Sequence, residues 1–85
     1  MKKFKKIMDA DTNREKTLKE YFSKHLKDLR EERGLSQCCV AKKLGCAVST
    51  YANWEQGRRE PSIFDIYNLL YIFEIDANEL FDVEL

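Results

Sequence analysis

The sequence predicts an all-α fold, and three observations support this prediction. Apolar residues recur at steps of three and four along most of the 85-residue chain, which is the spacing of one helix face. No stretch shows the sustained alternation of apolar and polar residues that is typical of a half-buried strand. The residues that interrupt helices lie at only four places, Gly34, Gly45, Gly57 and Pro61. We therefore expect short helices joined by tight turns.

The first predicted helix covers about residues 13–33. Thr12 and Glu15 have the spacing of a capping box, in which a hydroxyl and a carboxylate pair with backbone N–H groups at a helix start. An apolar series with helical steps follows, made of Leu18, Phe22, Leu26 and Leu29. No glycine or proline interrupts this segment, so one long helix is expected, although a break near Ser23 would divide it in two.

Two short helices are predicted next, over residues 37–44 and 48–56. Ser36 is the expected N-cap of the first, because its hydroxyl can accept a hydrogen bond from an unpaired N–H of the first turn. Gly45 is expected to end that helix, and Gly57 the following one. The turn between them is therefore only about three residues long.

The C-terminal part of the chain is expected to form two more helices. One opens at Ser62, with Asp65 completing a second capping box, and runs to about residue 73. Asp76 and Glu79 repeat the same spacing at the start of a last short helix. Five helices are expected in total.

Composition limits the classes of protein to which the chain can belong. With 44% hydrophobic and 35% charged residues, it is expected to fold as one soluble domain. No apolar stretch reaches the roughly 20 residues that span a membrane, and the basic N-terminus lacks the apolar segment of a signal peptide. An odd number of cysteines, two of them adjacent, does not suit a secreted disulfide framework. A cytoplasmic protein without a membrane partner is expected.

The sequence gives no indication of catalysis. The single histidine, His25, has no apparent nucleophile partner and is interpreted as a surface residue, and no glycine-rich phosphate loop is present. Three cysteines without a fourth ligand at suitable spacing do not make a structural zinc site. A redox switch at Cys38 and Cys39 is conceivable, but a tolerant surface position is favoured for both. We expect no enzyme activity, metal, cofactor or small-molecule ligand.

The helices at 37–44 and 48–56 have the layout of a helix-turn-helix. On the second helix Tyr51 and Trp54 share one side, and core packing is favoured for them over stacking on bases. The other side carries residues that are neither large nor acidic, namely Val48, Ser49, Ala52 and Asn53. Such a face can approach base edges in a major groove.

Three blocks of sequence surround this pair of helices: REERGLSQ at 30–37, AKKLG at 41–45 and WEQGRREPS at 54–62. Their order and spacing resemble the Cro and phage-repressor type of helix-turn-helix domain, the xenobiotic-response-element family, over residues 26–81. The resemblance implies a lambda-repressor-like, five-helix DNA-binding domain that usually acts as a dimer in transcriptional control. We accordingly divide the chain into an N-terminal extension, residues 1–21, and a helix-turn-helix domain, residues 22–85.

The resemblance also implies roles for individual residues. The base-reading positions of the family correspond to Ala47, Val48, Ser49, Thr50, Ala52 and Asn53. Contacts with DNA phosphates are implied for Gln37, at a helix N-terminus that attracts anions, and for Gln56, Arg58 and Arg59. Arg30 and Glu55 correspond to a partly buried ion pair with a structural role. Lys42 and Lys43 are interpreted as part of a solvated helix face.

Two positions depart from the family pattern. Ala47 stands where Ser or Thr commonly caps the recognition helix, so that cap is expected to be missing. Val48 stands where Gln or Arg often reads a base, and valine can only pack on a thymine methyl group. Specificity would then rest on Ser49, Asn53 and DNA shape, with Asn53 the best candidate for an adenine contact. An A·T-rich operator is expected.

The helix after Ser62 has more apolar surface than one core face requires. One stripe is assigned to the core, made of Ile63, Ile66, Leu69, Leu70 and Phe73. Phe64, Tyr67 and Tyr71 form a second stripe, which needs a cover. The N-terminal extension is one candidate cover, through Phe4, Ile7, Leu18 and Tyr21. We favour a second copy of the chain, because a two-fold dimer also places two recognition helices about 34 Å apart, one turn of DNA.

The sequence thus predicts a DNA-binding transcriptional regulator of repressor type that binds a short palindromic operator in double-stranded DNA as a homodimer. The alternative is a protein-interaction module with the same fold and weak or lost DNA binding, and Ala47 and Val48 keep it open.

The net charge of zero is the sum of two parts of the chain with opposite charge. Residues 1–61 carry 15 basic and 9 acidic side chains, whereas residues 62–85 carry 6 acidic and no basic ones. The basic part contains the helix-turn-helix.

Overall fold

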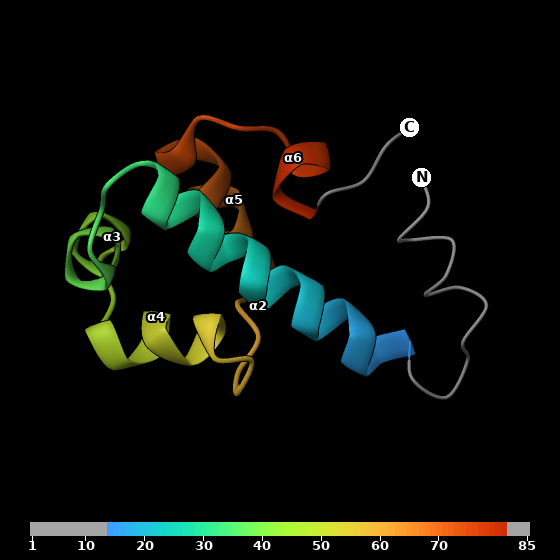
Figure 1. The fold of residues 1–85 in the computed structure, drawn as a ribbon. Coiled ribbons are helices and arrows are strands. Elements are labelled where there is room, and N and C mark those ends of the chain that lie inside the picture. Colours follow the sequence, from blue (N-terminus) through green and yellow to red (C-terminus); the bar gives the residue numbers. More distant parts are fainter. Residues whose placement is uncertain (1–13, 82–85) are drawn as a thin grey trace.

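The computed structural model describes residues 14–81, with side chains from residue 18 onwards, and this part of the chain is entirely helical (Figure 1). The helices are α2 (Arg14–Glu32), α3 (Gln37–Leu44), α4 (Val48–Glu55), α5 (Ile63–Phe73) and α6 (Ala77–Phe81). The predicted all-α fold is confirmed. The predicted capping residue Thr12 lies outside the described residues.

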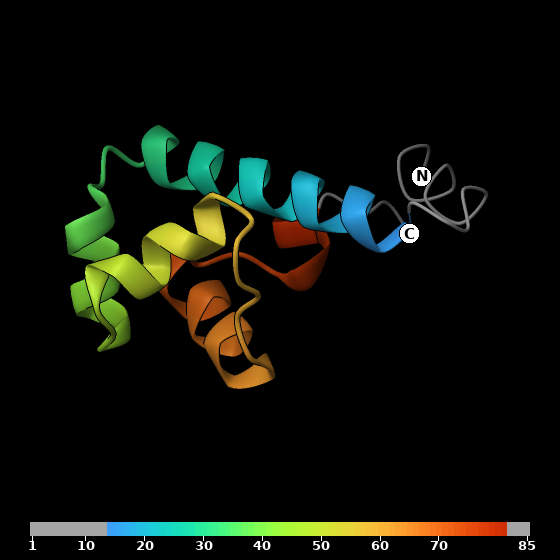
Figure 2. The same ribbon diagram turned by 90° about the horizontal axis from the view of Figure 1, so that it is seen from below.

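Helix α2 is the longest element and runs along one side of the molecule (Figure 2). It continues through Ser23 without the break that would have divided it, and α4 and α6 pack against it. Ser23 is buried on the side of α2 that faces Gly57, a residue of the turn after α4. A Cβ atom at Gly57 would lie 3.2 Å from the Ser23 hydroxyl oxygen, so α2 and the end of α4 are in close contact.

Local caps explain where the short helices begin and end. The Ser36 hydroxyl accepts a hydrogen bond from the Cys39 N–H at 3.0 Å, and Gly45 ends α3 with a left-handed φ of 75°. Ser62 and Asp65 form the predicted capping box at the start of α5. At the start of α4 the Ala47 side chain makes no capping hydrogen bond, because alanine has no polar side-chain atom.

One core joins all five described helices. Its buried apolar residues are Phe22, Leu26, Leu29, Val40, Ala41, Tyr51, Trp54, Leu69, Phe73 and Leu80. The Tyr51 and Trp54 rings meet edge to face, with centroids 5.8 Å apart, inside this core. Their assignment to the core is confirmed, and α4 is held in place by its inner side.

Two interpretations made from the sequence are wrong. Ile63 does not belong to the core stripe of α5, because it is 87% exposed on the first turn, on the side of the helix where Tyr67 follows one turn later. His25 is not simply a surface residue, because α6 packs on α2 and partly covers it. The His25 Nε2 atom lies within hydrogen-bond distance of the Glu79 carbonyl oxygen, a partner 54 residues away in the sequence.

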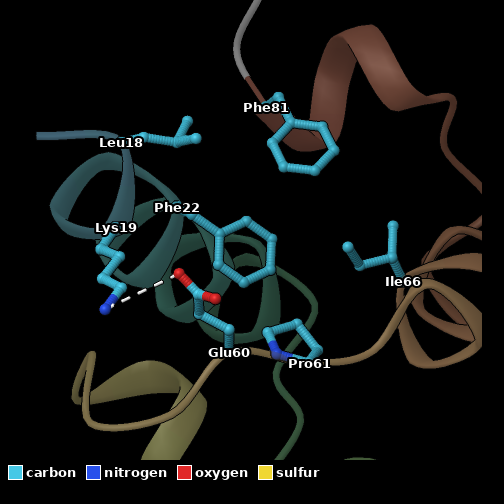
Figure 3. A pocket seen from close by; sticks show the side chains of 7 residues that line it. All are labelled: Leu18, Lys19, Phe22, Glu60, Pro61, Ile66 and Phe81. Atoms are coloured by element: carbon cyan, nitrogen blue, oxygen red, sulfur yellow. Dashed lines mark ion pairs between the residues drawn. The ribbon is translucent and has the colours of Figure 1, made fainter. Parts of the chain in front are cut away.

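A pocket of about 230 Å³ lies between α2, the segment that leads into α5, and α6 (Figure 3). Phe22 and Phe81 stack beside it with ring centroids 5.5 Å apart, and Leu18 lines it as well. Lys19 and Glu60 form an ion pair of 3.7 Å at this pocket. Of the candidate covers for the second stripe of α5, Phe4 and Ile7 lie outside the described residues. Leu18 and Tyr21 do not cover this stripe, since its residues Phe64, Tyr67 and Tyr71 are at least 65% exposed. None of the described helices is long and apolar enough to span a membrane.

Candidate nucleic-acid interface

The outward side of α4 is formed by small and polar side chains. Val48 is 42% exposed and Ser49 is exposed at the start of the helix. Thr50, Ala52 and Asn53 are half-buried along the same element. No acidic side chain stands on this face, since the only acidic residue of α4, Glu55, is buried. The face can therefore approach a polyanion without charge repulsion.

The opposite side of α4 is tied to α2 and α3 by a cluster of polar side chains. The Arg30 guanidinium donates two hydrogen bonds to the Glu55 carboxylate, from Nε at 2.6 Å and from Nη2 at 3.1 Å. Arg30 also donates to the Leu35 carbonyl oxygen at 2.8 Å. The Gln37 side-chain amide donates to the same carboxylate at 2.9 Å. The family-implied ion pair is thus present, with Gln37 as an additional member.

Opposing effects act on the pKa of the Glu55 carboxyl group. Burial disfavours the charged form and raises the pKa, but the hydrogen bonds from Arg30 and Gln37 outweigh burial and hold the pKa below its ordinary value. Burial, together with the Glu55 charge, raises the pKa of Tyr51. At neutral pH the cluster is therefore an ionised pair that connects three helices.

Gln37 occupies the first position of α3, where backbone N–H groups are free to bind an anion. Its side-chain nitrogen is engaged with Glu55, so the side chain is held in one orientation beside those N–H groups. Cys38 is exposed and Cys39 half-buried in the same turn. Sequence reasoning placed Gln37 at this helix start but missed its bond with Glu55, because the two residues are 18 positions apart.

The residues after α4 fold back onto the end of the helix. The backbone N–H of Arg58 donates to the Asn53 carbonyl oxygen at 2.9 Å, and the N–H of Arg59 lies 3.4 Å from the same oxygen. Gly57 allows this reversal because it adopts a left-handed φ of 73°. Arg58 and Arg59 are both exposed at this turn. The backbone of both residues is thereby held beside the C-terminal end of α4, with the two cationic side chains exposed.

The outer face of α5 differs in kind from that of α4. Its exposed residues are all large and apolar or aromatic: Ile63 at 87%, Phe64 at 70%, Tyr67 at 65% and Tyr71 at 80% exposure. We call this set the α5 stripe. It lies on a helix whose inner residues, Leu69 and Phe73, are buried in the core. Its size and continuity are typical of a protein-protein contact.

Comparison with known protein families supports the interpretation of α3 and α4. A helix-turn-helix family model matches residues 26–80, which include the polar cluster, both short helices, and α5. The chain belongs to the Cro and phage-repressor type of helix-turn-helix family. The match leaves out the first turns of α2, up to His25.

Two curated proteins are similar to the chain. The cryptic phage CTXphi transcriptional repressor RstR of Vibrio cholerae is 34% identical over 59 residues, which are 69% of this chain and 53% of that protein. The uncharacterized HTH-type transcriptional regulator YqaE of Bacillus subtilis (strain 168) is 34% identical over 59 residues, 69% of this chain and 51% of that protein. The chain thus matches about half the length of these relatives. No solved structure gave a significant match.

Proposed function

We propose that the protein is a sequence-specific DNA-binding transcriptional regulator of repressor type, and that α4 is its recognition helix. The supporting observation is that two groups suited to anions lie near the C-terminal end of α4: the N-terminus of α3, whose Gln37 side chain is bonded to Glu55, and the arginine turn at Arg58 and Arg59. A helix with a small, non-acidic face and phosphate contacts beside it suits the major groove of duplex DNA. The names of both similar proteins, a repressor and a regulator, agree with this proposal.

Each part of the interface has a distinct task in this proposal. The free N–H groups at the start of α3, with Gln37 held beside them, bind one phosphate. Gln56, Arg58 and Arg59 bind further phosphates along the turn that follows α4. Bases are read from Ala47 through Asn53, with Val48 packing on a thymine methyl group and Asn53 hydrogen-bonded to adenine. Because valine favours thymine, the expected operator is rich in A·T pairs.

We further propose that the α5 stripe joins two copies of the chain. In a dimer with two-fold symmetry, the α5 stripe of one chain packs against the α5 stripe of the other. Both recognition helices then face the same side of the duplex. Half-sites would then be about 34 Å apart, and the operator would be a short palindrome. The tyrosines suit such a contact, because each combines a large apolar ring with a hydroxyl that can remain hydrated.

Selection of bound sequences from random duplex DNA tests the proposal. The wild-type protein is expected to enrich an A·T-rich palindrome. The Arg58→Ala/Arg59→Ala variant is expected to bind that site more weakly without changing the preferred bases, because phosphate contacts carry no sequence information. Lys42→Ala/Lys43→Ala, which removes the same charge from the exposed end of α3, serves as the control.

Two results would contradict this proposal. If no sequence is enriched, and binding to duplex DNA does not weaken as salt rises, then α4 is not a recognition helix. The α5 stripe would then favour the alternative of a protein-interaction module. Enrichment of only G·C-rich sites would contradict the roles of Val48 and Asn53.

A further inference from the structure

A groove of about 520 Å³ runs between α2 and the end of α4, next to the interface described above, with which it shares Gln56. It is lined by Lys19, Glu20, Ser23, Lys24, Lys27, Glu55, Gln56 and Gly57. Most of the α2 residues in this set precede residue 26, where the family match begins. The groove is therefore formed largely by the part of α2 that precedes the family match.

The charges along the groove are not all available to a ligand. Lys19 is engaged with Glu60 at 3.7 Å, and the Glu55 carboxylate is neutralised by Arg30. Lys24 and Lys27 are exposed, and neither forms an ion pair within residues 18–81. Glu20 is the remaining exposed acidic residue in the lining. Two available cations thus stand against one carboxylate, which favours an anionic ligand.

The groove begins where the base-reading face of α4 ends. Gln56 lies three residues after Asn53 and four after Ala52, so at helical spacing it stands on the same face as both. Gln56 also lines the groove. A DNA strand that passes the C-terminal end of α4 would therefore continue along Lys24 and Lys27.

The close approach of α2 to the end of α4 makes this placement rigid. Buried Ser23 faces Gly57, where a Cβ atom would lie 3.2 Å from its hydroxyl oxygen. Ser23 directly precedes Lys24 and lies four residues before Lys27 on α2. The two lysines are thus held at a fixed position relative to the recognition helix rather than on a separate extension.

We propose that this groove is a second phosphate-binding surface, in which Lys24 and Lys27 bind the DNA backbone that flanks each half-site. The inference rests on the proposed DNA-binding function and adds a contact outside the base-reading positions. It predicts that the protein binds duplexes with extra flanking base pairs more tightly than the bare site, whatever the flanking sequence.

The test compares Lys24→Ala/Lys27→Ala with the charge-matched control Lys42→Ala/Lys43→Ala on the sequence selected from random DNA. Affinity is measured by fluorescence anisotropy at several salt concentrations, on the bare site and on the same site with random flanks. In the groove variant the salt slope is expected to fall by about 1.8, since each phosphate contact contributes about 0.9. The preference for flanked duplexes should also disappear, whereas the control should keep both properties.

A charge change of opposite sign sharpens the test. Glu20→Gln removes the exposed carboxylate from the groove and should strengthen binding to flanked duplexes while leaving the bare site unchanged. If the groove variant, the control and the wild type have the same slope and the same flank preference, the groove is not a phosphate site and the recognition-helix proposal still stands. If the wild type shows no salt-dependent DNA binding at all, both proposals fail.

Discussion

Helices α4 and α5 are alike on their inner sides and different on their outer sides. Both bury aromatic residues in the same core, Tyr51 and Trp54 from α4 and Phe73 from α5. Outward, α4 presents small side chains and a flanking arginine turn, whereas α5 presents the large apolar stripe that includes Tyr67 and Tyr71. The core side fixes where each helix stands, and the outer side determines what it can bind: a polar, charged duplex for α4 and an apolar protein surface for α5.

The largest expected effect comes from removing the charge that anchors α4. Glu55→Ala leaves the half-buried Arg30 guanidinium without its carboxylate and the Gln37 amide without its acceptor. We expect a loss of about 3 to 5 kcal/mol in the free energy of unfolding, measured by urea denaturation. Glu32→Ala, which removes an exposed carboxylate of α2 outside the cluster, should change it by less than about 0.5 kcal/mol. Equal effects of the two variants would show that the cluster does not anchor α4.

The second effect concerns the α5 stripe. Tyr67→Ser/Tyr71→Ser should weaken self-association by roughly 100-fold, or about 2.8 kcal/mol, as expected for aromatic residues at the centre of a contact. Because both side chains are exposed, the monomer should remain folded by circular dichroism. Analytical ultracentrifugation over a concentration series measures the association. A wild-type protein that stays monomeric throughout would contradict the proposed homodimer.

The third effect separates base reading from anchoring. Asn53→Ala should cost about 1 to 3 kcal/mol in binding to the selected site and relax the preference at one base pair. Thermal unfolding should change little, because the Asn53 carbonyl oxygen that holds the arginine turn belongs to the backbone and is retained. An unchanged base preference would remove Asn53 from the reading face.

The fourth effect is a pH dependence that follows from Glu55. Its pKa in the folded protein lies below the ordinary value of about 4.3, so its charge stabilises the fold above that pH. This contribution is lost as the pH falls through the lowered pKa. The difference in urea midpoint between wild type and Glu55→Gln should therefore be largest near neutral pH and shrink below about pH 4. A constant difference would contradict the ionised pair.

The smallest effect is expected from Tyr51→Phe. The buried Tyr51 hydroxyl lies close to Glu55 and Arg30, but within the described residues it makes no hydrogen bond of normal geometry, so its removal takes away a desolvated polar group and keeps the packed ring. The free energy of unfolding should change by less than about 1 kcal/mol in denaturant titrations, and DNA binding should be unchanged. A loss as large as that of Glu55→Ala would place the hydroxyl inside the polar cluster.

Local signals explain how much of the structure could be predicted from the sequence. Ser36, Gly45 and the Ser62–Asp65 box act on the backbone within a few residues, so the bounds of α3 and the start of α5 could be derived from them. The predicted range for α4, 48–56, differs by one residue, because Gln56 is the cap that follows Glu55.

Contacts between distant residues were the part that could not be derived. The partner of His25 is in α6, and the acceptor of the Gln37 amide is at the end of α4. The exposure of Ile63 depends on how far α5 is rotated against the core, which spacing alone does not determine. For the groove beside Lys24, the available sequence signal was the presence of lysines on the part of α2 that precedes the family match.

The central claim is that α4 and its flanking phosphate contacts bind duplex DNA. The most direct measurement is the salt dependence of binding to the selected duplex, from about 50 to about 200 mM salt, for the wild type and for Arg58→Ala/Arg59→Ala. We expect a steep fall in wild-type affinity as salt rises and a slope smaller by about 1.8 in the variant, since each phosphate contact contributes about 0.9. A wild-type affinity that does not change with salt, or identical slopes for the two proteins, would contradict it.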